Sequence, residues 1–448
     1  MSVKVRFAPS PTGRLHVGNV RAALFNWLFA KKQGGRFLLR SDDTDQERST
    51  KAYEDGIIED LAWLGISHDE FFRQSERFAE YDAVRDYLIA EGLLYPCYES
   101  AEELDRKRKL QRARSLPPVY DRAALGLSDA DRAKLEAEGR RPHWRFKLSQ
   151  KPVRWDDLIR GEVVVDTSAV SDPVLIREDG GYLYTLPSCV DDVDSGISHV
   201  VRGEDHVTNT ATQIELFEAI IRFRGTGVVP VFAHHSLLIG ADGQSLSKRL
   251  GSLSIAAMRA DGLEPEAITS LLARLGTSDP VEPKVNISML VEGFSFDRMG
   301  RAPARFDMAE LEGLNAKILH EMPWERVAER VEALGGNEAL WLAVHGNINK
   351  LGDIADWVAV VSGEIDPVIE NEEVTKAAAE ALPQGIIKPE DWGDIIEKVK
   401  AATGAKGKSL FMPLRLALTG KAHGPEMGAL LALIGAEKAK ARLLGQRA

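Results

Sequence analysis

Residues 9–19 read P-S-P-T-G-R-L-H-V-G-N, and the segments on either side give this stretch its meaning. Residues 3–8 (V-K-V-R-F-A) form a strand-like run before it, and from Val20 apolar side chains recur at helical spacing until Gly34. A second buried strand is predicted at residues 36–40 (R-F-L-L-R). Strand, glycine- and proline-rich loop, helix and strand make a βαβ unit, which predicts an α/β fold with a phosphate group bound at the loop.

The loop carries residue types that suit phosphate binding. The start of a helix presents free backbone N–H groups and a positive dipole end. Gly18 leaves room for a ligand to approach the backbone, and His16 can donate a hydrogen bond to a phosphoryl oxygen as charge develops on it. A capped turn with a surface histidine would explain H-x-G alone, but the eleven-residue run between strand and helix favours the phosphate site.

Further motifs follow in order along the chain: D-D-T-D at 42–45, Y-T-L-P-S-C-V-D-D at 184–192, V-V-R-G-E-D-H at 200–206 and S-L-S-K-R at 245–249. Together with the first stretch, they resemble the signatures of class I aminoacyl-tRNA synthetases, in the form found in bacterial glutamyl-tRNA synthetases. The resemblance implies a glutamate–tRNA ligase, which activates L-glutamate with ATP and transfers it to the 3′ end of tRNA(Glu). Whether tRNA(Gln) is a second acceptor stays open.

The resemblance also implies site residues. His16 and Lys248 would be catalytic, stabilising charge on the α-phosphate and the leaving pyrophosphate, with Mg²⁺ arriving on ATP. The implied ATP-binding residues are Pro9, Ser10, Pro11, Thr12, Gly13, His16, Gly18, Asn19, Ser245, Leu246, Ser247, Lys248 and Arg249. The implied glutamate-binding residues are Arg6, Ala8, Ser10, Asp42, Tyr184, Ser188 and Arg202.

Three of these positions depart from the usual family pattern: Asp42 stands for glutamate, Ser188 for a frequent asparagine and Ser245 for the first lysine of the second signature. Structural alternatives stay open beside the functional ones. Thr44 or Asp45 could cap a helix, Arg202 could pair with Asp205, and S-K-R could be an ordinary surface loop.

Secondary structure beyond the first unit is predicted from periodicity. Two or three helices are expected over residues 46–95, and strands over R-F-K-L, V-R-W and V-V-V-D between 145 and 166. Strands are also expected at 182–186 (Y-L-Y-T-L) and 198–202, followed by a helix to Ile221 that Thr208 or Asn209 caps.

The domains expected from the resemblance are a Rossmann-type catalytic domain (1–78 and 182–236), an α+β insertion that handles the tRNA acceptor end (79–181), a stem-contact segment (237–306) and an anticodon-binding domain (307–448). The last is predicted to be all-helical, unlike the β-barrel domains of glutaminyl enzymes. The periodic runs behind this prediction are 308–320, 323–334, 371–382, 389–403, 410–419 and 436–445.

Composition indicates an ordinary globular protein without a membrane partner, since no run of about 18 apolar residues is present. The N-terminus reads directly into a strand, so a cytoplasmic location is expected, as is a monomer from the resemblance. Some glutamyl enzymes hold zinc in the insertion with closely spaced cysteines. Here Cys97 has no cysteine nearby, so no zinc site is expected and Cys97 is interpreted as a packed thiol.

The net charge of −11 disfavours a nucleic-acid partner. Two basic zones oppose this: residues 101–160 hold 16 Lys/Arg against 10 Asp/Glu, and residues 401–448 hold 8 against 2. Solvated charged faces would give the same pattern.

Two other functions remain compatible with the motifs. A small-molecule nucleotidylyltransferase shares the H-x-G helix start, but it would need neither the helical C-terminal third nor the Lys248 loop. A paralogue that does not charge tRNA is suggested by Asp42 and Ser245. Pyrophosphate exchange with glutamate, with and without tRNA, separates these alternatives.

Overall fold

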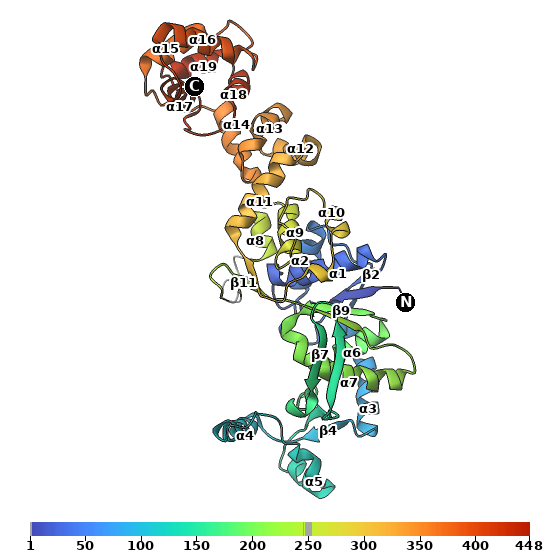
Figure 1. Cartoon of the computed structure of the whole chain (residues 1–448). Coiled ribbons are helices and arrows are strands. Elements are labelled where there is room, and N and C mark those ends of the chain that lie inside the picture. Colours follow the sequence, from blue (N-terminus) through green and yellow to red (C-terminus); the bar gives the residue numbers. More distant parts are fainter. Residues whose placement is uncertain (1, 245, 247–252) are drawn as a thin grey trace. The chain divides into compact units, whose positions relative to one another are not determined.

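The computed structural model describes residues 2–244, 246 and 253–448 (Figure 1). Ser245, Ser247, Lys248 and Arg249 of the second signature lie outside the described residues. The chain forms two compact units. The first contains Met1–Met258, Thr269–Val281 and Asn286–Asp307, and the second contains Arg259–Ile268, Glu282–Val285 and Met308–Ala448.

The first unit begins with the predicted βαβ arrangement. Strand β1 (Lys4–Phe7), helix α1 (Val17–Lys32) and strand β2 (Arg36–Ser41) follow one another, and β1 and β2 pair in parallel. Helix α1 ends just before Gly34, whose φ of +60° favours glycine. Strand β3 (Glu70–Arg73) extends the sheet beside β2. The βαβ prediction is therefore confirmed.

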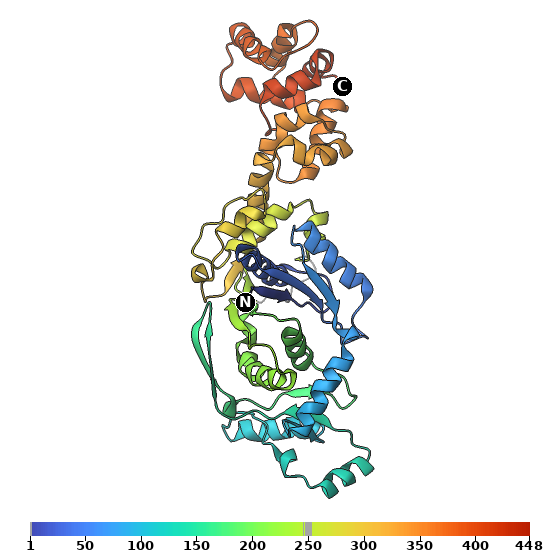
Figure 2. The same cartoon turned by 90° about the vertical axis from the view of Figure 1, so that its right-hand side faces the viewer.

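A second set of parallel strands, in a separate sheet, lies beside the first. Strand β9 (His199–Gly203) pairs with β10 (Val231–His235), and the backbone N–H of Ser198 donates to Lys4 O at 2.9 Å, which brings β9 beside β1. Figure 2 shows the two sets of strands together. The carboxyl ends of β1 and β9 thus meet where the strand order reverses, which is the ligand edge of doubly wound sheets.

Residues of the expected insertion contribute to two sheets. Strands β4 (Leu94–Cys97), β5 (His143–Phe146) and β8 (Val174–Ile176) form an antiparallel sheet. Strand β6 (Pro152–Asp157) pairs antiparallel with β7 (Gly161–Asp166) and parallel with β10. The predicted strands near 145–166 are confirmed. The remaining elements of this unit are α2 (Lys51–Trp63), α3 (Phe78–Ala90), α4 (Ala101–Ala113), α5 (Asp129–Ala137), α6 (Thr185–Asp194), α7 (Val207–Arg224), β11 (Leu238–Gly240), α10 (Ser288–Glu292) and β12 (Ala304–Phe306).

Two local predictions were wrong. Residues 182–186 are not a strand, because only Tyr182 bridges to Ile176 and α6 starts at Thr185. Pro187 suits this helix start, where a missing N–H costs nothing. Helix α7 begins at Val207 without a side-chain cap, so neither Thr208 nor Asn209 caps it. Strands β3 and β4 were also missed, since four-residue strands show little alternation.

The second unit is helical. Its elements after residue 307 are α11 (Met308–Glu321), α12 (Trp324–Ala333), α13 (Glu338–Val344), α14 (Ile354–Ser362), α15 (Glu372–Ala381), α16 (Asp391–Thr403), α17 (Lys408–Thr419), α18 (Met427–Ile434) and α19 (Ala436–Leu443). Helices α8 (Ile255–Ala260) and α9 (Pro265–Arg274) lie where the two units divide the sequence. Between 308 and 448 the described chain contains no strand, as predicted. None of the described helices has the length and apolar character needed to span a bilayer.

Candidate active site

A cavity of about 430 Å³ opens at the carboxyl ends of β1 and β9. It is the place where the fold is expected to bind ligand. The cavity brings together eight of the residues that the sequence implied: Arg6, Ala8, His16, Gly18, Asn19, Tyr184, Arg202 and Leu246. These come from β1 and the following loop, from the start of α1, from the N-terminus of α6, from β9 and from the second signature, which are far apart in the sequence.

His16 is held in one orientation by the helix that it caps. Its Nδ1 accepts from the backbone N–H of Gly18 at 3.1 Å, and Asn19 Oδ1 accepts from the His16 N–H. Burial lowers the pKa of His16 below its ordinary value, so the ring is neutral at pH 7. Because Nδ1 accepts, the ring proton is on Nε2, which makes that atom the donor available to a ligand.

The glycine at position 18 leaves room not only for a nucleotide but also for the side chain of His16. A Cβ atom at Gly18 would lie 3.0 Å from His16 Cε1 and 3.1 Å from His16 Nδ1. A side chain here would push the imidazole away from the backbone that fixes it. Glycine therefore leaves the histidine ring in place, whereas a larger residue would displace it by a few tenths of an ångström.

Arg6 is the penultimate residue of β1, and its guanidinium is anchored through Nε alone. Arg6 Nε donates to both carboxylate oxygens of Asp192, at 3.2 and 3.1 Å. Among the described residues its two terminal nitrogens have no hydrogen-bond partner, and the side chain lines the cavity. Arg6 therefore presents two donors to a ligand.

Arg202 is buried among neutral partners. Its nitrogens contact His234 Nε2 (3.2 Å), Tyr184 Oη (3.4 Å), Thr210 Oγ1 (2.7 Å) and Gln213 Oε1 (2.6 Å). Burial lowers the pKa of Arg202, since within the described chain no carboxylate bonds to it. The alternative of an ion pair with Asp205 is not what the structure shows, because Asp205 instead lies 3.8 Å from His206.

His234 receives its orientation from the strand beside it. Its Nδ1 lies 2.5 Å from Asp157 Oδ2, so this nitrogen carries the proton and Nε2 is free to accept from Arg202. Burial lowers the pKa of His234 despite the nearby carboxylate, and the ring stays neutral. Asp157, His234 and Arg202 thus form a buried chain that ends at the cavity.

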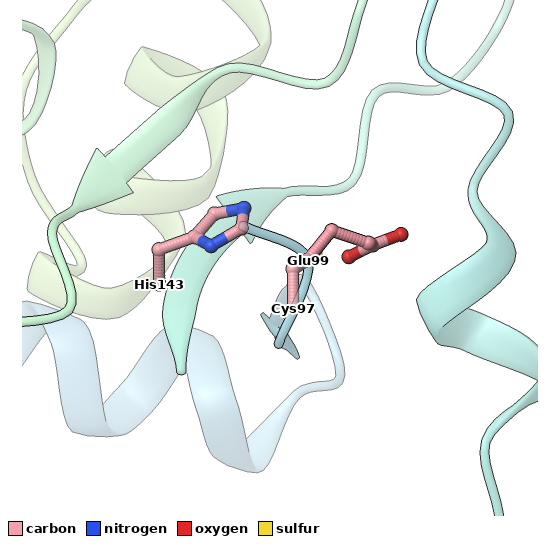
Figure 3. Close-up of side chains that lie close together, drawn as sticks. All are labelled: Cys97, Glu99 and His143. Carbon is pink, nitrogen blue, oxygen red and sulfur yellow. The ribbon is translucent and has the colours of Figure 1, made fainter. Parts of the chain in front are cut away.

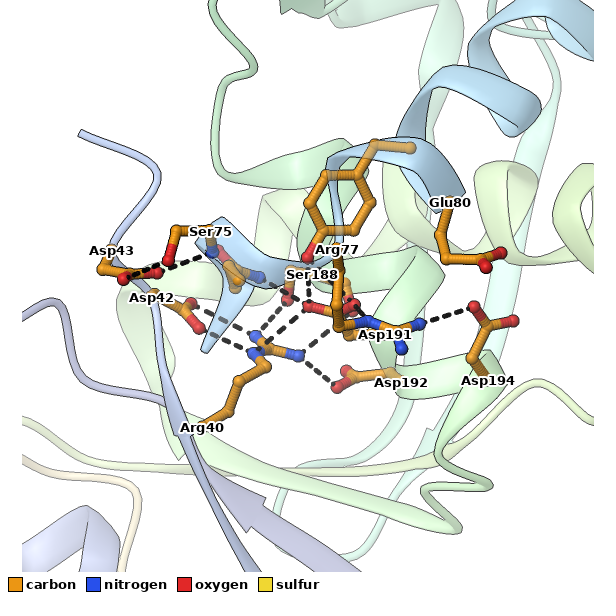
Figure 4. A network of polar contacts seen from close by, with 12 residues as sticks. Arg40, Asp42, Asp43, Ser75, Arg77, Glu80, Ser188, Asp191, Asp192 and Asp194 are labelled. Carbon is orange, nitrogen blue, oxygen red and sulfur yellow. Dashed lines mark hydrogen bonds and ion pairs between the residues drawn. The ribbon is translucent and has the colours of Figure 1, made fainter. Parts of the chain in front are cut away.

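Asp42 and Ser188 do not line the cavity. Both face Arg40, as Figure 4 shows: Arg40 Nε donates to Asp42 Oδ1 at 2.6 Å, and Arg40 Nη2 donates to Ser188 Oγ at 3.1 Å. Burial raises the pKa of Asp42 to about 6, and Arg40 opposes a further rise. The helix-cap alternative at Thr44 or Asp45 fails, because Thr50 caps α2.

The proline-rich loop lies beside the cavity lining. Pro9, Ser10, Pro11, Thr12 and Gly13 are not among the residues that line the cavity. Two backbone bonds of 3.0 Å hold the loop: the bond from Asp42 N to Pro9 O ties it to the residue after β2, and the bond from Thr50 N to Pro11 O ties it to the N-cap of α2. The loop is therefore fixed next to the cavity, where a larger ligand can reach it.

Among the cavity residues that were not predicted, three are buried and polar: Arg21, Asn26 and His235. Within the described chain Arg21 Nε, Asn26 Oδ1 and His235 Nε2 have no hydrogen-bond partner. Burial lowers the pKa of His235 to about 3. Polar residues inside the otherwise apolar run of α1 were the available signal for the first two.

A second group of polar residues lies away from the cavity. One potential ligand atom from each of Cys97, Glu99 and His143 lies within 4.8 Å of the others (Figure 3). Burial raises the pKa of the Cys97 thiol to about 11. The sequence spacing missed His143, because strand pairing of β4 with β5 brings it opposite Cys97.

The donor types suit zinc, and in the described chain Glu99 Oε2 and His143 Nε2 lack hydrogen-bond partners. Other contacts oppose a cation. Glu99 Oε1 already accepts from Tyr120 Oη at 2.9 Å and lies 3.4 Å from Lys107 Nζ. Burial and then the neighbouring Arg145 charge lower the pKa of His143. The group is therefore incomplete as a zinc site, with three donors facing two cationic side chains.

A parallel sheet with a ligand cavity at its reversal point and a donor histidine on a helix N-terminus defines a Rossmann-type nucleotide-binding enzyme. The model of the catalytic domain of class I tRNA synthetases (E and Q) matches residues 2–312, and an anticodon-binding-domain model matches residues 338–446. The chain therefore belongs to the class I tRNA synthetase family of the E and Q type.

Similar proteins agree with this membership. Glutamate–tRNA ligase 1 of Maricaulis maris is 58% identical, over 99% of this chain and 100% of its own. Glutamate–tRNA ligase 2 of Hyphomonas neptunium is 57% identical, over 98% of this chain and 99% of its own. A crystal structure of a glutamate tRNA ligase from Elizabethkingia meningosepticum in complex with its amino acid has a TM-score of 0.84 at 29% identity, covering 99% of this chain and 98% of that one. These findings confirm the expected family and fold class.

Proposed function

We propose that this chain activates L-glutamate with ATP and transfers the glutamyl group to the 3′ end of tRNA(Glu). The chain is a glutamate–tRNA ligase, in line with relatives of that name at 50–58% identity. The nucleotidylyltransferase alternative accounts for neither domain match. One observation carries the substrate assignment: Arg202 is a buried guanidinium whose partners in the described chain are all neutral.

A carboxylate is the natural complement of this arrangement. A buried charge without a counter-ion is costly, and a guanidinium grips a carboxylate through two parallel bonds. Arg6 and Arg202 both face the cavity, so the two carboxylates of glutamate can be bound there together. Tyr184, at the start of α6, supplies an aromatic wall to the same space. Glutamine has one carboxylate fewer and would leave a buried donor unpaired.

The chemistry requires positioning rather than a protein nucleophile. The α-carboxylate of glutamate attacks the α-phosphate of ATP, a glutamyl-adenylate forms and pyrophosphate leaves. His16 donates from Nε2 to the phosphoryl oxygens. Lys248, in the segment 245–249, is proposed to bind the leaving pyrophosphate. Mg²⁺ accompanies ATP and neutralises phosphate charge.

The experiment that tests this function is ATP–pyrophosphate exchange with purified protein, measured with and without tRNA. Exchange that requires glutamate, followed by charging of tRNA(Glu), supports the ligase. Exchange without glutamate would indicate a nucleotidylyltransferase, and exchange without charging of any tRNA would indicate the paralogue. Charging purified tRNA(Glu) and tRNA(Gln) separately settles the acceptor.

Separate regions are proposed to hold the tRNA. Residues 79–181 would contact the acceptor end, 237–306 the stem and 307–448 the anticodon. Helix α4, in the first basic zone, supports the acceptor contact, because none of its 13 residues is buried and it carries five Lys/Arg. We further propose that the enzyme is a cytoplasmic monomer. Both cysteines are buried and free, as a reducing compartment allows.

Removing the positive charges of Lys406 and Lys408 should weaken tRNA binding. Both side chains are exposed at the start of α17, and the described chain offers them no ion pair. If each lysine neutralises a phosphate, the double alanine variant should flatten the dependence of log affinity on log salt by about 0.7 to 0.9 for each of those phosphates. Filter binding at several salt concentrations measures this slope.

Lys376 and Lys400 provide the matched control, since both are lysines of the same helical unit that are already paired, with Glu372 and Glu397 respectively. Their double alanine variant should keep the parent slope. If Lys406 and Lys408 behave like this control, the C-terminal charge is a solvated face, and anticodon contacts must be sought between 307 and 400.

Purified protein is expected to contain no stoichiometric zinc, because Lys107 and Arg145 already place positive charge around Cys97, Glu99 and His143. Elemental analysis by mass spectrometry after dialysis measures the metal content. About one zinc per chain that disappears in His143→Ala would contradict this expectation and show that the three donors suffice.

A further inference from the structure

Arg40 lies at the centre of a buried polar network behind one wall of the cavity (Figure 4). It stands near the end of β2, is 0% exposed and does not line the cavity. Asp42 accepts from Arg40 Nε and Nη2 at 2.6 and 3.2 Å, and Ser188 Oγ accepts from Nη2 at 3.1 Å. Two sides of the guanidinium are thus fixed, and the remaining nitrogen, Nη1, is directed at α6.

Arg40 Nη1 bonds to Asp192, the carboxylate that also anchors Arg6. Arg40 Nη1 donates to Asp192 Oδ1 at 2.9 Å, and Arg6 Nε donates to both oxygens of Asp192 from the other side. Asp192 is 2% exposed. It therefore joins one guanidinium that faces the cavity to one that never reaches it.

The shared carboxylate explains an unusual feature of Arg6. Arginine and carboxylate groups prefer a forked pair, in which a terminal nitrogen takes part. Arg6 instead uses Nε alone, which leaves both terminal nitrogens for the cavity. Without Arg40, Asp192 would be free to turn and form the forked pair with Arg6, and it would then compete with the substrate for those nitrogens.

The charges in the network fit this role. Burial disfavours the charge of Arg40, but the nearby carboxylates of Asp42, Asp192 and Asp191 outweigh it and raise the pKa of Arg40 above its ordinary value. Arg40 is therefore a permanent cation beside Asp192.

We propose that Arg40 is a positioning residue for glutamate selection. By holding Asp192, it keeps the terminal nitrogens of Arg6 turned toward the cavity and available to a substrate carboxylate. This inference rests on the proposed function, because it assumes that glutamate is the ligand of Arg6.

The test is Arg40→Lys, which keeps the charge but cannot bond to Asp42, Ser188 and Asp192 at once. The KM for glutamate in pyrophosphate exchange should rise about 10- to 100-fold, since a small displacement of a binding group is that costly. The KM for ATP should stay within about twofold, and the preference for glutamate over glutamine should fall. If Arg40 only stabilised the fold, its replacement would not raise the KM for glutamate while leaving the KM for ATP unchanged.

Arg77→Lys is the matched control. Arg77 also bonds to carboxylates of α6, with Nε 2.7 Å from Asp191 Oδ1 and Nη2 2.7 Å from Asp194 Oδ2, but it does not contact Asp192. The variant should lose some thermal stability and keep the parent KM for glutamate. An equal rise of KM in both variants would overturn the inference, because the effect would then belong to α6 as a whole.

The outcomes separate this inference from the proposed function. A parent protein that shows no glutamate-dependent exchange even with tRNA(Glu) present contradicts the function itself. A selective parent with an unchanged KM in folded Arg40→Lys overturns only the positioning role. If Arg40→Lys does not fold, the double variant Arg40→Met with Asp42→Leu removes both members of the buried pair, a change that proteins often tolerate. It should show the same rise in KM, and an unchanged KM overturns the inference.

Discussion

Replacing Arg202 by methionine should lower kcat/KM for glutamate activation by about 10³- to 10⁴-fold, because a site built around a buried charge discriminates strongly when the complementary pair is lost. The neutral partners Thr210, Gln213 and His234 hold the guanidinium in place and cannot themselves replace its charge. ATP binding should be nearly unaffected. Steady-state pyrophosphate exchange, with each substrate varied in turn, measures both quantities.

Arg36→Met serves as the control, since this arginine begins β2 on the surface with a 70% exposed side chain in a weak pair with Glu70. It should behave like the parent. Arg202→Met protein that remains folded and still prefers glutamate to glutamine would remove Arg202 from the substrate site.

Replacing His16 by alanine should lower the rate of adenylate formation by about 10²- to 10³-fold, which is the range for loss of one donor aimed at transition-state charge. Glutamate binding should change little, because His16 acts on the phosphate. Single-turnover measurement of adenylate formation isolates this step from product release. Because burial lowers the pKa of His16, any change of rate that comes from protonation of this ring should occur at a lower pH than for an exposed histidine.

The same substitution also removes a helix cap, which costs about 1 kcal/mol of stability. His16→Asn separates the two effects, because asparagine is a good cap but does not place a donor where Nε2 of the imidazole lies. The expected result is near-parent thermal stability with the rate loss of His16→Ala. Near-parent activity in His16→Asn would show that His16 serves the helix alone.

Sequence patterns predicted those elements that depend on interactions between residues close together in the chain. The βαβ unit was readable because a buried strand, a loop with Gly18 and an apolar helix follow each other directly. Helices α14 and α18 were missed for the opposite reason. Nearly all their residues are apolar, so no polar face reveals a helical period.

Contacts between distant segments could not be predicted. Ser188 and Asp42 were expected at the substrate, but the structure turns both toward Arg40, a residue that no motif singled out. His143 likewise meets Cys97 only through strand pairing. In each case the decisive partner is set by the tertiary fold, where a fully buried guanidinium needs several acceptors at once.

Strand β6 has a consequence for how the protein is built and shortened. Its last residue, Asp157, comes from the segment 79–181, yet it sets the tautomer of His234 and thereby seats Arg202. Without this segment, His234 would lose the carboxylate that fixes its tautomer, and Arg202 would keep Thr210 and Gln213 but lose an oriented acceptor at Nε. The segment therefore supports the cavity, although none of its residues lines it. A shortened chain would have to supply a different hydrogen-bond acceptor for His234.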